Sequence, residues 1–574
     1  MTAVRPIAAA LGAVALVCTG AHGQALQPVE PGGRTGEPPP LQRELPRPLP
    51  PPVPLLPPLP PPAPGPLTPL PGERVFVREI RVHGSTVFSP AEIAQVTAPY
   101  VNREVSSEDL EALRVALTLL YVKAGYVNSG AVLPDQTVTD GVVTFTIVEG
   151  ALTAINVRGN RWLRDRYVSQ RLRLGAGPPL NVETLQRQLQ LILTDPHFDR
   201  LNAELRPGLT PGESTLDILV EEANPFRVFL DFNNYQSPSI GAERGSVTLE
   251  HLSVTGHGDV LSLRYGRSEG ADPQLDFRYA LPLTARDLTF IAEYRRNTFA
   301  VIEEPFRELN IESESEVYTL TLRAPVYRTL NHLLALELTG ERLRNQTFLL
   351  GEPFSLTPGA HNGESVVTAL RFAQEWVYRT ERQVIAARSR FSLGVDVLDA
   401  TTNAGDVPDS RFFAWLGQFQ YVQRLPLRDT TLIARGDVQL AADPLLTLEQ
   451  VAVGGRYTVR GYRENTLVRD NAVVASLEAR IPVIREVRWA DYIEVAPFVD
   501  FGRGWNNTGP EPKVRSIWSV GVGLRWALTF PAYAGYRVRP FLEVYWGHAL
   551  RDVETGNGNL QDKGVHFQFV LAAF

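Results

Sequence analysis

The sequence predicts two small α+β domains in tandem, followed by a transmembrane antiparallel β-barrel of about sixteen strands. Three observations support this prediction. From about residue 226 to the C-terminus, segments of alternating apolar and polar residues follow one another without a helical pattern. The more polar face of these segments carries full charges. Between residues 73 and 225, a strand–helix–helix–strand–strand pattern occurs twice.

The N-terminus is typical of an exported protein. Arg5 precedes an apolar run that ends at Cys18, and the small residues just before Gln24 predict a signal peptide at residues 1–23. The apolar run is too short to cross a bilayer as a helix. Cys18 leaves a lipoprotein as an alternative, although Val17 is bulkier than such processing sites usually allow.

Residues 24–72 are dominated by proline, as in LPPPVPLLPPLPPPAPGPLTPLP. Proline lacks a backbone donor and fixes φ, so this segment joins neither a helix nor a sheet. We expect an extended, semi-rigid linker of the polyproline II type. A docking site for a partner that reads proline is the alternative.

The first α+β domain, residues 73–150, opens with the predicted strand FVREIRVHG. A short helix is then expected to start with Ser89 as its N-cap and Pro90 at its first position. Glu92 is the capping-box partner of Ser89. A longer helix begins near Ser107, and the strands VNSGAVLP and GVVTFTIVEG close the domain. The longer helix places one apolar face at helical spacing, made of Leu110, Leu113, Leu117, Leu120 and Tyr121.

The second α+β domain, residues 151–225, repeats this order with a period of about 75 residues. LTAINVRGN is its first strand, and a short helix is expected at about 165–172. Asn181 caps the next helix, and RLNAELRPG and STLDILVEEA close the domain. That helix carries its apolar face on Leu185, Leu189 and Ile192.

The remaining residues, 226–574, predict the barrel. In LDFRYA, for example, Leu275 and Phe277 alternate with Asp276 and Arg278. A soluble β-sandwich alternates in the same way, but its core would bury charges without partners at a high cost. A water-filled lumen accepts such charges, so the sequence favours a membrane barrel. The charges in question are Arg264, Glu293, Arg435, Asp437, Arg525 and Glu543.

Several classes of function are not supported by the sequence. The net charge of −7 suggests no nucleic-acid partner, and removal of the signal peptide removes the only cysteine. No later segment has eighteen uninterrupted apolar residues, as a transmembrane helix requires. Nucleotide and metal motifs are missing, so we expect no cofactor, no metal site and no enzymatic activity. The nucleophile-like GRSEG at 266–270 is followed by a predicted strand rather than the required helix.

One connection between strands, at about residues 442–470, is far longer than an ordinary hairpin loop. It contains VGGRYTVRGYRENTLVRD, whose glycines and arginines suggest a phosphate cradle, but a cradle requires a following helix. The next strand, YIEVAPFVDFGRGW, turns Asp500 into the lumen. An inward-folded loop would let Arg460 pair with Asp500, whereas separate solvation of both residues is the alternative.

These motifs resemble a known bacterial family. VRGY and FVDFG resemble the paired motifs of outer-membrane barrels that carry POTRA domains, and the two α+β units resemble POTRA domains. With about sixteen strands, the chain after Pro71 resembles the two-partner secretion transporters of the hemolysin-activator type, ShlB/FhaC/HecB. The residues that carry the motifs are Val459, Arg460, Gly461 and Tyr462 in the loop, and Phe498, Asp500 and Gly502 in the strand.

The resemblance implies that Arg460 contacts Asp500 inside the barrel. It also implies that the POTRA domains capture an unfolded exoprotein in the periplasm, by strand addition, and that the pore passes it to the surface. The implied partners are this exoprotein, outer-membrane lipid and the barrel-assembly machinery. Phe574 resembles a C-terminal assembly signal, although the more apolar face of the last strand has the opposite parity. A plug helix, frequent in the family, has little sequence available before the prolines.

Three alternatives to a secretion pore remain. An outer-membrane insertase of the same superfamily would usually carry more POTRA units. A passive porin or a lipase-like barrel enzyme would not need POTRA units, and the failed nucleophile motif further disfavours the enzyme.

Overall fold

The computed structural model describes residues 74–509, 512–532, 536–553 and 558–574. These residues form two compact units, one of residues 74–225 with 253–258, and one of 226–252 with 259–574. The predicted signal peptide and the proline-rich linker lie outside the described residues. Within the described ranges, none of the helices is long and apolar enough to cross a membrane.

The first α+β domain has one more small sheet than the sequence predicts. FVREIRVHG forms two strands rather than one, because the backbone N–H groups of Arg78 and Glu79 both donate to the carbonyl of Gly141 and break the strand there. β1 then pairs with β3, while β2 pairs in parallel with β5 in the order β2-β5-β4. The elements are β1 Val75–Val77, β2 Glu79–His83, α3 Pro90–Thr97, β3 Arg103–Val105, α4 Ser107–Lys123, β4 Gly130–Val132 and β5 Val142–Val148.

Capping residues set the helix starts of this domain. Ser89 accepts from the backbone of Glu92, whose carboxylate accepts in return from the backbone of Ser89, so α3 begins at Pro90 as expected. Ser106 and Asp109 form the same arrangement before α4. The apolar face of α4 packs onto β5 in the core of the domain, where Leu113, Leu117 and Tyr121 are buried.

The second α+β domain has the same organisation. Its sheet has the order β6-β8-β7, and its core is built on leucines of the two helices. The repeat extends to single residues, since Gly84 and Gly159 occupy the same place in the two domains and both have positive φ. A Cβ added at Gly84 would stand 2.5 Å from the carbonyl oxygen of Ile147, and one added at Gly159 would stand 2.3 Å from that of Val220. The elements are β6 Ala151–Arg158, α5 Asp165–Arg173, α6 Val182–Ile192, β7 Phe198–Pro207 and β8 Glu213–Glu222.

The two α+β domains are joined by hydrogen bonds around Asn181. Its side-chain oxygen caps α6 by accepting from the backbone of Glu183 and Thr184, while its amide donates to the carbonyl of Ala124 at the end of α4. The backbone N–H of Val182 donates to the carbonyl of Gly125. One side chain therefore serves the cap of one domain and the helix end of the other.

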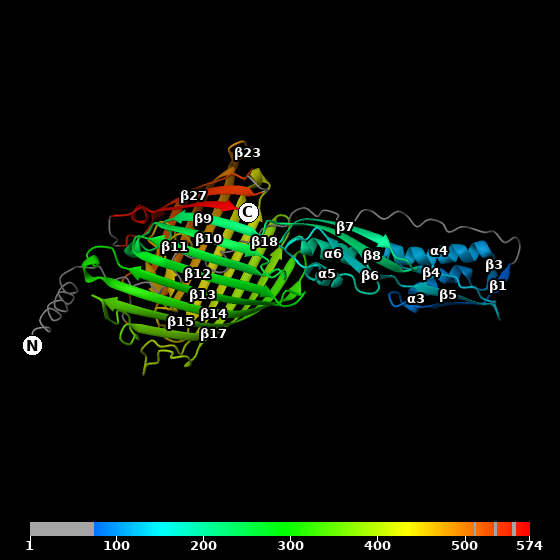
Figure 1. Ribbon diagram of the computed structural model, residues 1–574, viewed down its shortest axis with the longest axis horizontal. Helices are drawn as coiled ribbons and strands as arrows, with labels where there is room; N and C mark the ends of the chain where they lie inside the picture. The colour runs from blue at the N-terminus through cyan, green and yellow to red at the C-terminus, as the bar shows by residue number, and fades with distance from the viewer. Residues whose placement is uncertain (1–73, 510–511, 533–535, 554–557) are drawn as a thin grey trace, which may run out of the picture. The chain divides into compact units, whose positions relative to one another are not determined.

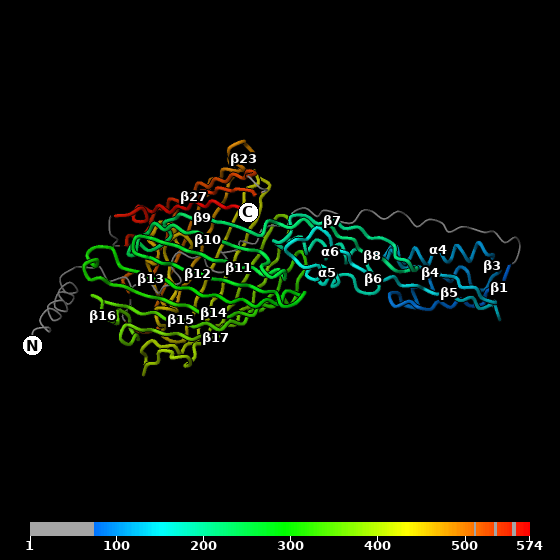
Figure 2. Tube along the Cα trace, viewed as in Figure 1, coloured from blue at the N-terminus to red at the C-terminus, as the bar shows by residue number. Residues whose placement is uncertain are grey.

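The larger unit is a closed barrel, confirming the predicted class (Figure 1). In the described part of the chain, sixteen antiparallel strands close through pairing of β28 with β9, and the two-residue β16 and β26 extend the sheet. Neighbours in sequence lie side by side around the wall (Figure 2). The strands are β9 Phe226–Asn233, β10 Arg244–Leu252, β11 Val260–Ser268, β12 Ala271–Pro282, β13 Thr289–Ala300, β14 Ile311–Arg328, β15 His332–Leu349, β16 Glu352–Pro353, β17 Glu364–Arg379, β18 Gln383–Gly394, β19 Phe413–Arg424, β20 Thr431–Ala441, β23 Asn471–Val487, β24 Ala490–Trp505, β25 Ser516–Ala527, β26 Phe530–Pro531, β27 Arg537–Ala549 and β28 Val565–Ala573.

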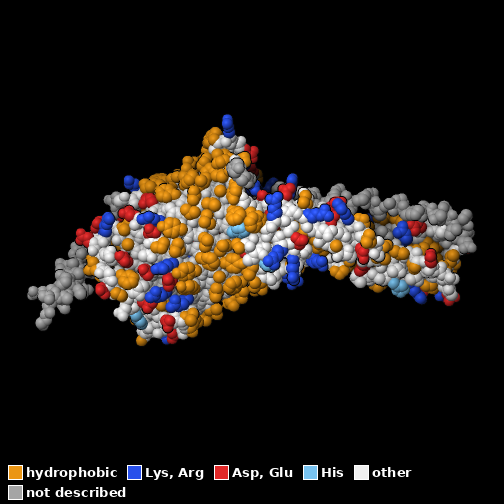
Figure 3. All heavy atoms as spheres, in the orientation of Figure 1, with side chains coloured by type: hydrophobic (Ala, Val, Ile, Leu, Met, Phe, Trp, Pro, Cys, Tyr) orange, Lys and Arg blue, Asp and Glu red, His pale blue; other side chains and the backbone are white. Residues whose placement is uncertain are grey.

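The two faces of the barrel wall differ as the alternation predicts. Leu477 and Val499 point outward and are 44% and 45% exposed, whereas Glu478 and Asp500 beside them point inward and are buried. Hydrophobic side chains cover much of the outer wall in Figure 3. Charges on the inner face pair with one another, as in Arg323 with Glu337 and Glu375, Arg388 with Glu337, and Arg278 with Glu293.

Candidate functional site

The long connection after β20 folds into the barrel as a hairpin. Within residues 442–470, β21 (Val451–Val453) pairs antiparallel with β22 (Leu467–Arg469). We call residues 442–470 the inner loop. The residues between β21 and β22 form its tip. At this tip Val459, Arg460 and Tyr462 are buried. The backbone pairing gives the inner loop a defined shape, and the alternation of the sequence does not predict this hairpin.

Arg460 is fully buried against the inner wall of β23 and β24. Its Nε and Nη2 atoms donate to the two carboxylate oxygens of Asp500, each at 2.8 Å, and its backbone N–H donates to Asp500 at 3.0 Å. Nη1 pairs with Glu478, and Nη2 also donates to Ser476. The guanidinium carbon stands 3.6 Å from the ring centre of Phe498. The arrangement is bidentate and charge-assisted, and the ring adds a cation–π contact.

The other motif residues shape this contact. Gly502 leaves room for the tip, because a Cβ there would stand 2.4 Å from Val453 and 2.8 Å from Val459. Gly461 has a φ of +88° and lies against β27, where a Cβ would meet the backbone of Gly547 at 2.8 Å. The Tyr462 hydroxyl lies 2.9 Å from the carbonyl oxygen of Trp518. At both glycines the missing side chain therefore lets the inner loop approach the wall closely.

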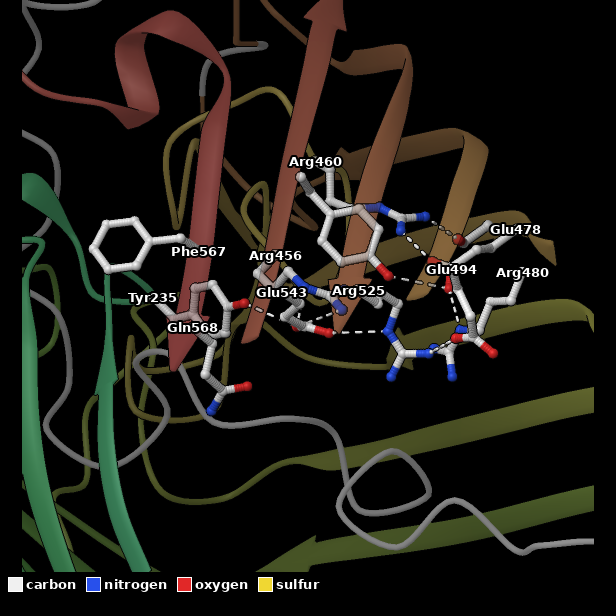
Figure 4. A network of polar contacts seen from close by, with 12 residues as sticks. Tyr235, Arg456, Arg460, Glu478, Arg480, Glu494, Arg525, Glu543, Phe567 and Gln568 are labelled. Carbon is white, nitrogen blue, oxygen red and sulfur yellow. Dashed lines mark hydrogen bonds and ion pairs between the residues drawn. The ribbon is translucent and has the colours of Figure 1, made fainter. Parts of the chain in front are cut away.

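A second ionic cluster holds the inner loop beside the first. Arg456 donates to Glu543 of β27 through Nε at 2.9 Å and Nη2 at 2.7 Å. Glu543 also accepts from the hydroxyl of Tyr235 and pairs with Arg525, which in turn pairs with Glu494 at 2.9 Å. Figure 4 shows this chain of contacts running beside Arg460 along the inner wall.

Three further ion pairs fasten the inner loop at other points. Arg463 pairs with Asp562 in the loop before β28, and with Glu303 in the loop after β13 at 2.8 Å. At the start of the inner loop, Glu449 accepts from Arg371 of β17 at 2.7 Å and 3.1 Å. The inner loop is thus bound to strands and loops on several sides of the lumen.

The partners of Arg460 were only partly visible in the sequence. Alternation places Glu478 and Glu543 on the inner face, and the quoted loop segment contains Arg456 and Arg463 as well as Arg460. A clustering of four arginines in one long loop, set against inward carboxylates, was therefore the available signal. Alternation does not say which arginine reaches which carboxylate, since that depends on the hairpin.

Phe574 and the nucleophile-like GRSEG segment have simpler surroundings. β28 ends at Ala573, and Phe574 exchanges two backbone hydrogen bonds with Arg537 at the start of β27. The GRSEG segment ends β11 and leads directly into β12, so it is a turn between strands. No group of three or more His, Cys, Asp or Glu side chains within the described ranges is placed to hold a metal ion.

Two α+β domains before a sixteen-stranded barrel with an inward-folded loop define the class of outer-membrane protein transporters. Residues 212–526 match the haemolysin secretion/activation proteins ShlB/FhaC/HecB, and residues 75–150 match the POTRA domain of the ShlB type. The chain belongs to this family. It is an outer-membrane pore of two-partner secretion with periplasmic POTRA domains, as the resemblance implied.

Curated relatives and solved structures agree with this assignment. The chain is 24% identical to the outer membrane transporter CdiB of Dickeya dadantii, over 82% of this chain and 87% of that protein. It is also 24% identical to the hemolysin transporter protein ShlB of Serratia marcescens, over 71% and 72%.

In structure, the chain resembles CdiB from Escherichia coli with a TM-score of 0.64, 19% identity and coverage of 87% and 91%. BamA from Haemophilus ducreyi has a TM-score of 0.51 at 14% identity, over 87% and 100%. At these identities the two structures support the fold alone. The sequence relatives are secretion transporters, so the insertase alternative is less supported.

Proposed function

We propose that the inner loop is a fastened part of the secretion pore, and that Arg460 holds it in its working position while the exoprotein passes. The observation that carries this proposal is the buried, bidentate contact of Arg460 with Asp500, reinforced by Glu478. Removing Arg460 leaves the buried carboxylate of Asp500 without its guanidinium partner, and breaking a buried ion pair in this way costs about 3–5 kcal/mol. The loop tip would then no longer be held against β24.

The POTRA domains supply the capture step of the proposal. β7 is an edge strand in the order β6-β8-β7, so its outer backbone groups are available to pair with an extended segment of another chain. An unfolded exoprotein can present such segments at many places along its length. Its folding outside the cell would give direction to transport without a nucleotide and without enzymatic chemistry in the pore.

Two further partners follow from the barrel itself. The outward apolar side chains, such as Leu477, Val499 and Trp518, are placed to contact outer-membrane lipid. The barrel-assembly machinery is the expected partner during insertion, with Phe574 as the terminal residue of its signal.

The proposal is tested by Arg460→Ala, which we expect to reduce secretion of the exoprotein to background while the barrel still inserts. Secretion is measured in the culture medium, and insertion by the heat-modifiable mobility of the barrel on gels. The matched control is Arg278→Ala, which removes a lumenal arginine that pairs with Glu293 of the neighbouring strand at 2.9 Å. Normal secretion by Arg460→Ala would show that the Arg460 contact is dispensable.

A further inference from the structure

The connection from β9 to β10, residues 234–243, is buried at its start, and we call it the first loop. Its residues Asn234, Tyr235 and Gln236 are 0% exposed. The backbone N–H of Tyr235 donates to the side-chain oxygen of Asn233 at 3.0 Å, where the chain turns away from β9. Connections between strands usually run over the surface, so a buried connection calls for a structural or functional reason.

The first loop is held by hydrogen bonds on both sides of the seam, the pairing of β28 with β9 that closes the barrel. Asn234 donates its backbone N–H to the carbonyl of Phe567 in β28, and its side-chain oxygen accepts in return from the backbone of Phe567 at 2.8 Å. Gln236 donates to the hydroxyl of Ser268 in β11 at 3.2 Å and accepts from Gln274 in β12 at 3.2 Å. The wall therefore fixes the position of the first loop.

One side chain of the first loop reaches the ionic cluster that holds the inner loop. The hydroxyl of Tyr235 donates to Oε1 of Glu543 at 2.9 Å. The same oxygen accepts from Nε and Nη2 of Arg456, at 2.9 Å and 2.7 Å. Figure 4 shows Tyr235 and Arg456 meeting at the carboxylate of Glu543. The hydroxyl and the guanidinium thus bind one acceptor, and each constrains how that acceptor is presented to the other.

The first loop also packs directly against the inner loop. The rings of Tyr235 and Tyr457 meet edge to face, with their centres 5.5 Å apart. Arg456 is in turn held within the inner loop, because its backbone N–H donates to the carboxylate of Glu464 at 2.6 Å. A change in the orientation of Glu543 is therefore felt by the inner loop through a side chain whose own backbone is fixed.

We propose that Tyr235 is a further positioning residue for the inner loop and acts through Glu543. A hydrogen bond to an ionised group is stronger than one between neutral groups, so the hydroxyl holds the carboxylate in the orientation that Arg456 needs. The inference rests on the proposed role of the inner loop and extends it. Arg460 fastens the tip to β23 and β24, whereas Tyr235 fixes the acceptor on β27 from the side of the seam.

The test measures hydrogen exchange in the inner loop of the full-length protein in nanodiscs, by mass spectrometry of peptides from residues 453–470. Tyr235→Phe keeps the ring that packs on Tyr457 and removes the hydroxyl. We expect inner-loop exchange to become about tenfold faster, because losing a hydrogen bond to a charged group favours local opening by about this factor. The matched control is Tyr421→Phe, which removes a hydroxyl that donates to Gln423 in β19 at 3.0 Å and is expected to leave inner-loop exchange unchanged.

A second background tests the route through Glu543. In Arg456→Gln the inner loop no longer binds this carboxylate through a guanidinium, so adding Tyr235→Phe is expected to change inner-loop exchange by less than about twofold. Glu543→Gln provides the same comparison if Arg456→Gln does not insert. A full tenfold effect of Tyr235→Phe in this background would overturn the route through Glu543.

Two results with Tyr235→Phe alone would overturn its positioning role. One is unchanged exchange in the inner loop, and the other is faster exchange confined to β9 and β28. Hydrogen exchange is read without secretion, so the two proposals fail separately. Faster inner-loop exchange in Tyr235→Phe, combined with normal secretion by Arg460→Ala, would refute the proposed function and support the role of Tyr235.

Discussion

At the scale of single residues, the inner loop is held by buried charges, each of which pairs with an opposite charge. Taking an ion out of water costs several kcal/mol unless partners satisfy it. Arg460 has Asp500 and Glu478, and Glu478 also pairs with Arg480 at 2.6 Å. Such a cluster is stable only when complete, so each member is needed to keep the others buried.

Gly461→Ala tests the close approach of the loop tip to β27. The new Cβ would stand 2.8 Å from the backbone of Gly547, and the φ of +88° disfavours alanine, so we expect secretion to fall strongly. Gly351→Ala is the control, because Gly351 has a φ of +83° but no atom near its Cβ position. Secretion assays compare the two variants. An equal, small effect in both would mean that close packing at Gly461 does not matter.

The residue scale also shows where sequence reasoning stops. Alternation along YIEVAPFVDFGRGW correctly turns Asp500 inward, and the motif singles out Arg460. Neither indicates that Glu478 and Glu543 complete two separate clusters, because a pleat fixes the face of a strand but not what crosses the lumen to meet it. The missing information lies in the pairing of β21 with β22.

At the scale of elements, the joint between the POTRA domains includes one residue with two roles. Asn181 caps α6 and donates to the carbonyl of Ala124. The sequence predicted the cap, since asparagine before an apolar helix is a helix start. The contact with the other domain was not predictable, because nothing local encodes a partner 57 residues away.

Asn181→Ala is expected to lower the free energy of unfolding by about 1 kcal/mol through the lost cap. Asn181→Asp keeps the capping acceptor but replaces the donor to Ala124 by a carboxylate oxygen, so it weakens the joint while the cap remains. Hydrogen exchange of the Val182 amide, which donates to Gly125, reports on the joint in both variants. Unchanged protection of that amide in Asn181→Asp would mean that the side-chain bridge does not hold the domains together.

A second element-scale prediction concerns the carboxylate of Glu149, which holds the loop after β2. Burial would raise its pKa, but hydrogen bonds from Thr86, Tyr121 and Val87 outweigh this and lower the pKa below its ordinary 4.5. Because the pKa of this carboxylate is lower in the folded than in the unfolded domain, its charged form stabilises the fold at pH values above the unfolded pKa. This stabilisation is lost as the pH falls through the folded pKa.

Thermal unfolding at decreasing pH should therefore show a shallower loss of stability in Glu149→Gln than in the unchanged protein. The difference is expected below about pH 4.5, where an unfolded glutamate is more than half protonated while the folded carboxylate keeps its charge. Identical acid profiles for the two proteins would assign the acid sensitivity to other carboxylates.

At the scale of the whole molecule, the class of fold was predictable because apolar residues recur with a different period in each unit. A strand with one face on lipid and one on water alternates every second residue, and a helix over a sheet repeats at 3.6 residues. The closed barrel and the POTRA fold follow from these patterns. The division of FVREIRVHG into β1 and β2 does not, since it arises from the contact with Gly141.

The whole-molecule claim is that the inner loop stays fastened to the wall during secretion. A covalent lock tests it, because no cysteine follows Cys18 in the sequence. A Cβ added at residue 502 would stand 2.8 Å from a methyl carbon of Val459. In a disulfide, each sulfur lies roughly 3 Å from the Cβ of the other cysteine. Cysteines at residues 459 and 502 are therefore close to the spacing that a disulfide needs. Val453→Ala removes the methyl that would stand 2.4 Å from the Cβ added at residue 502.

The most direct measurement is secretion by the variant Val453→Ala, Val459→Cys, Gly502→Cys, with and without a reductant. A loop that works while fastened predicts that the oxidised and reduced forms secrete the exoprotein equally, with Val453→Ala alone as the control. Secretion that stops on oxidation and returns with the reductant would contradict the account, because it would show that the inner loop has to leave the wall for the exoprotein to pass.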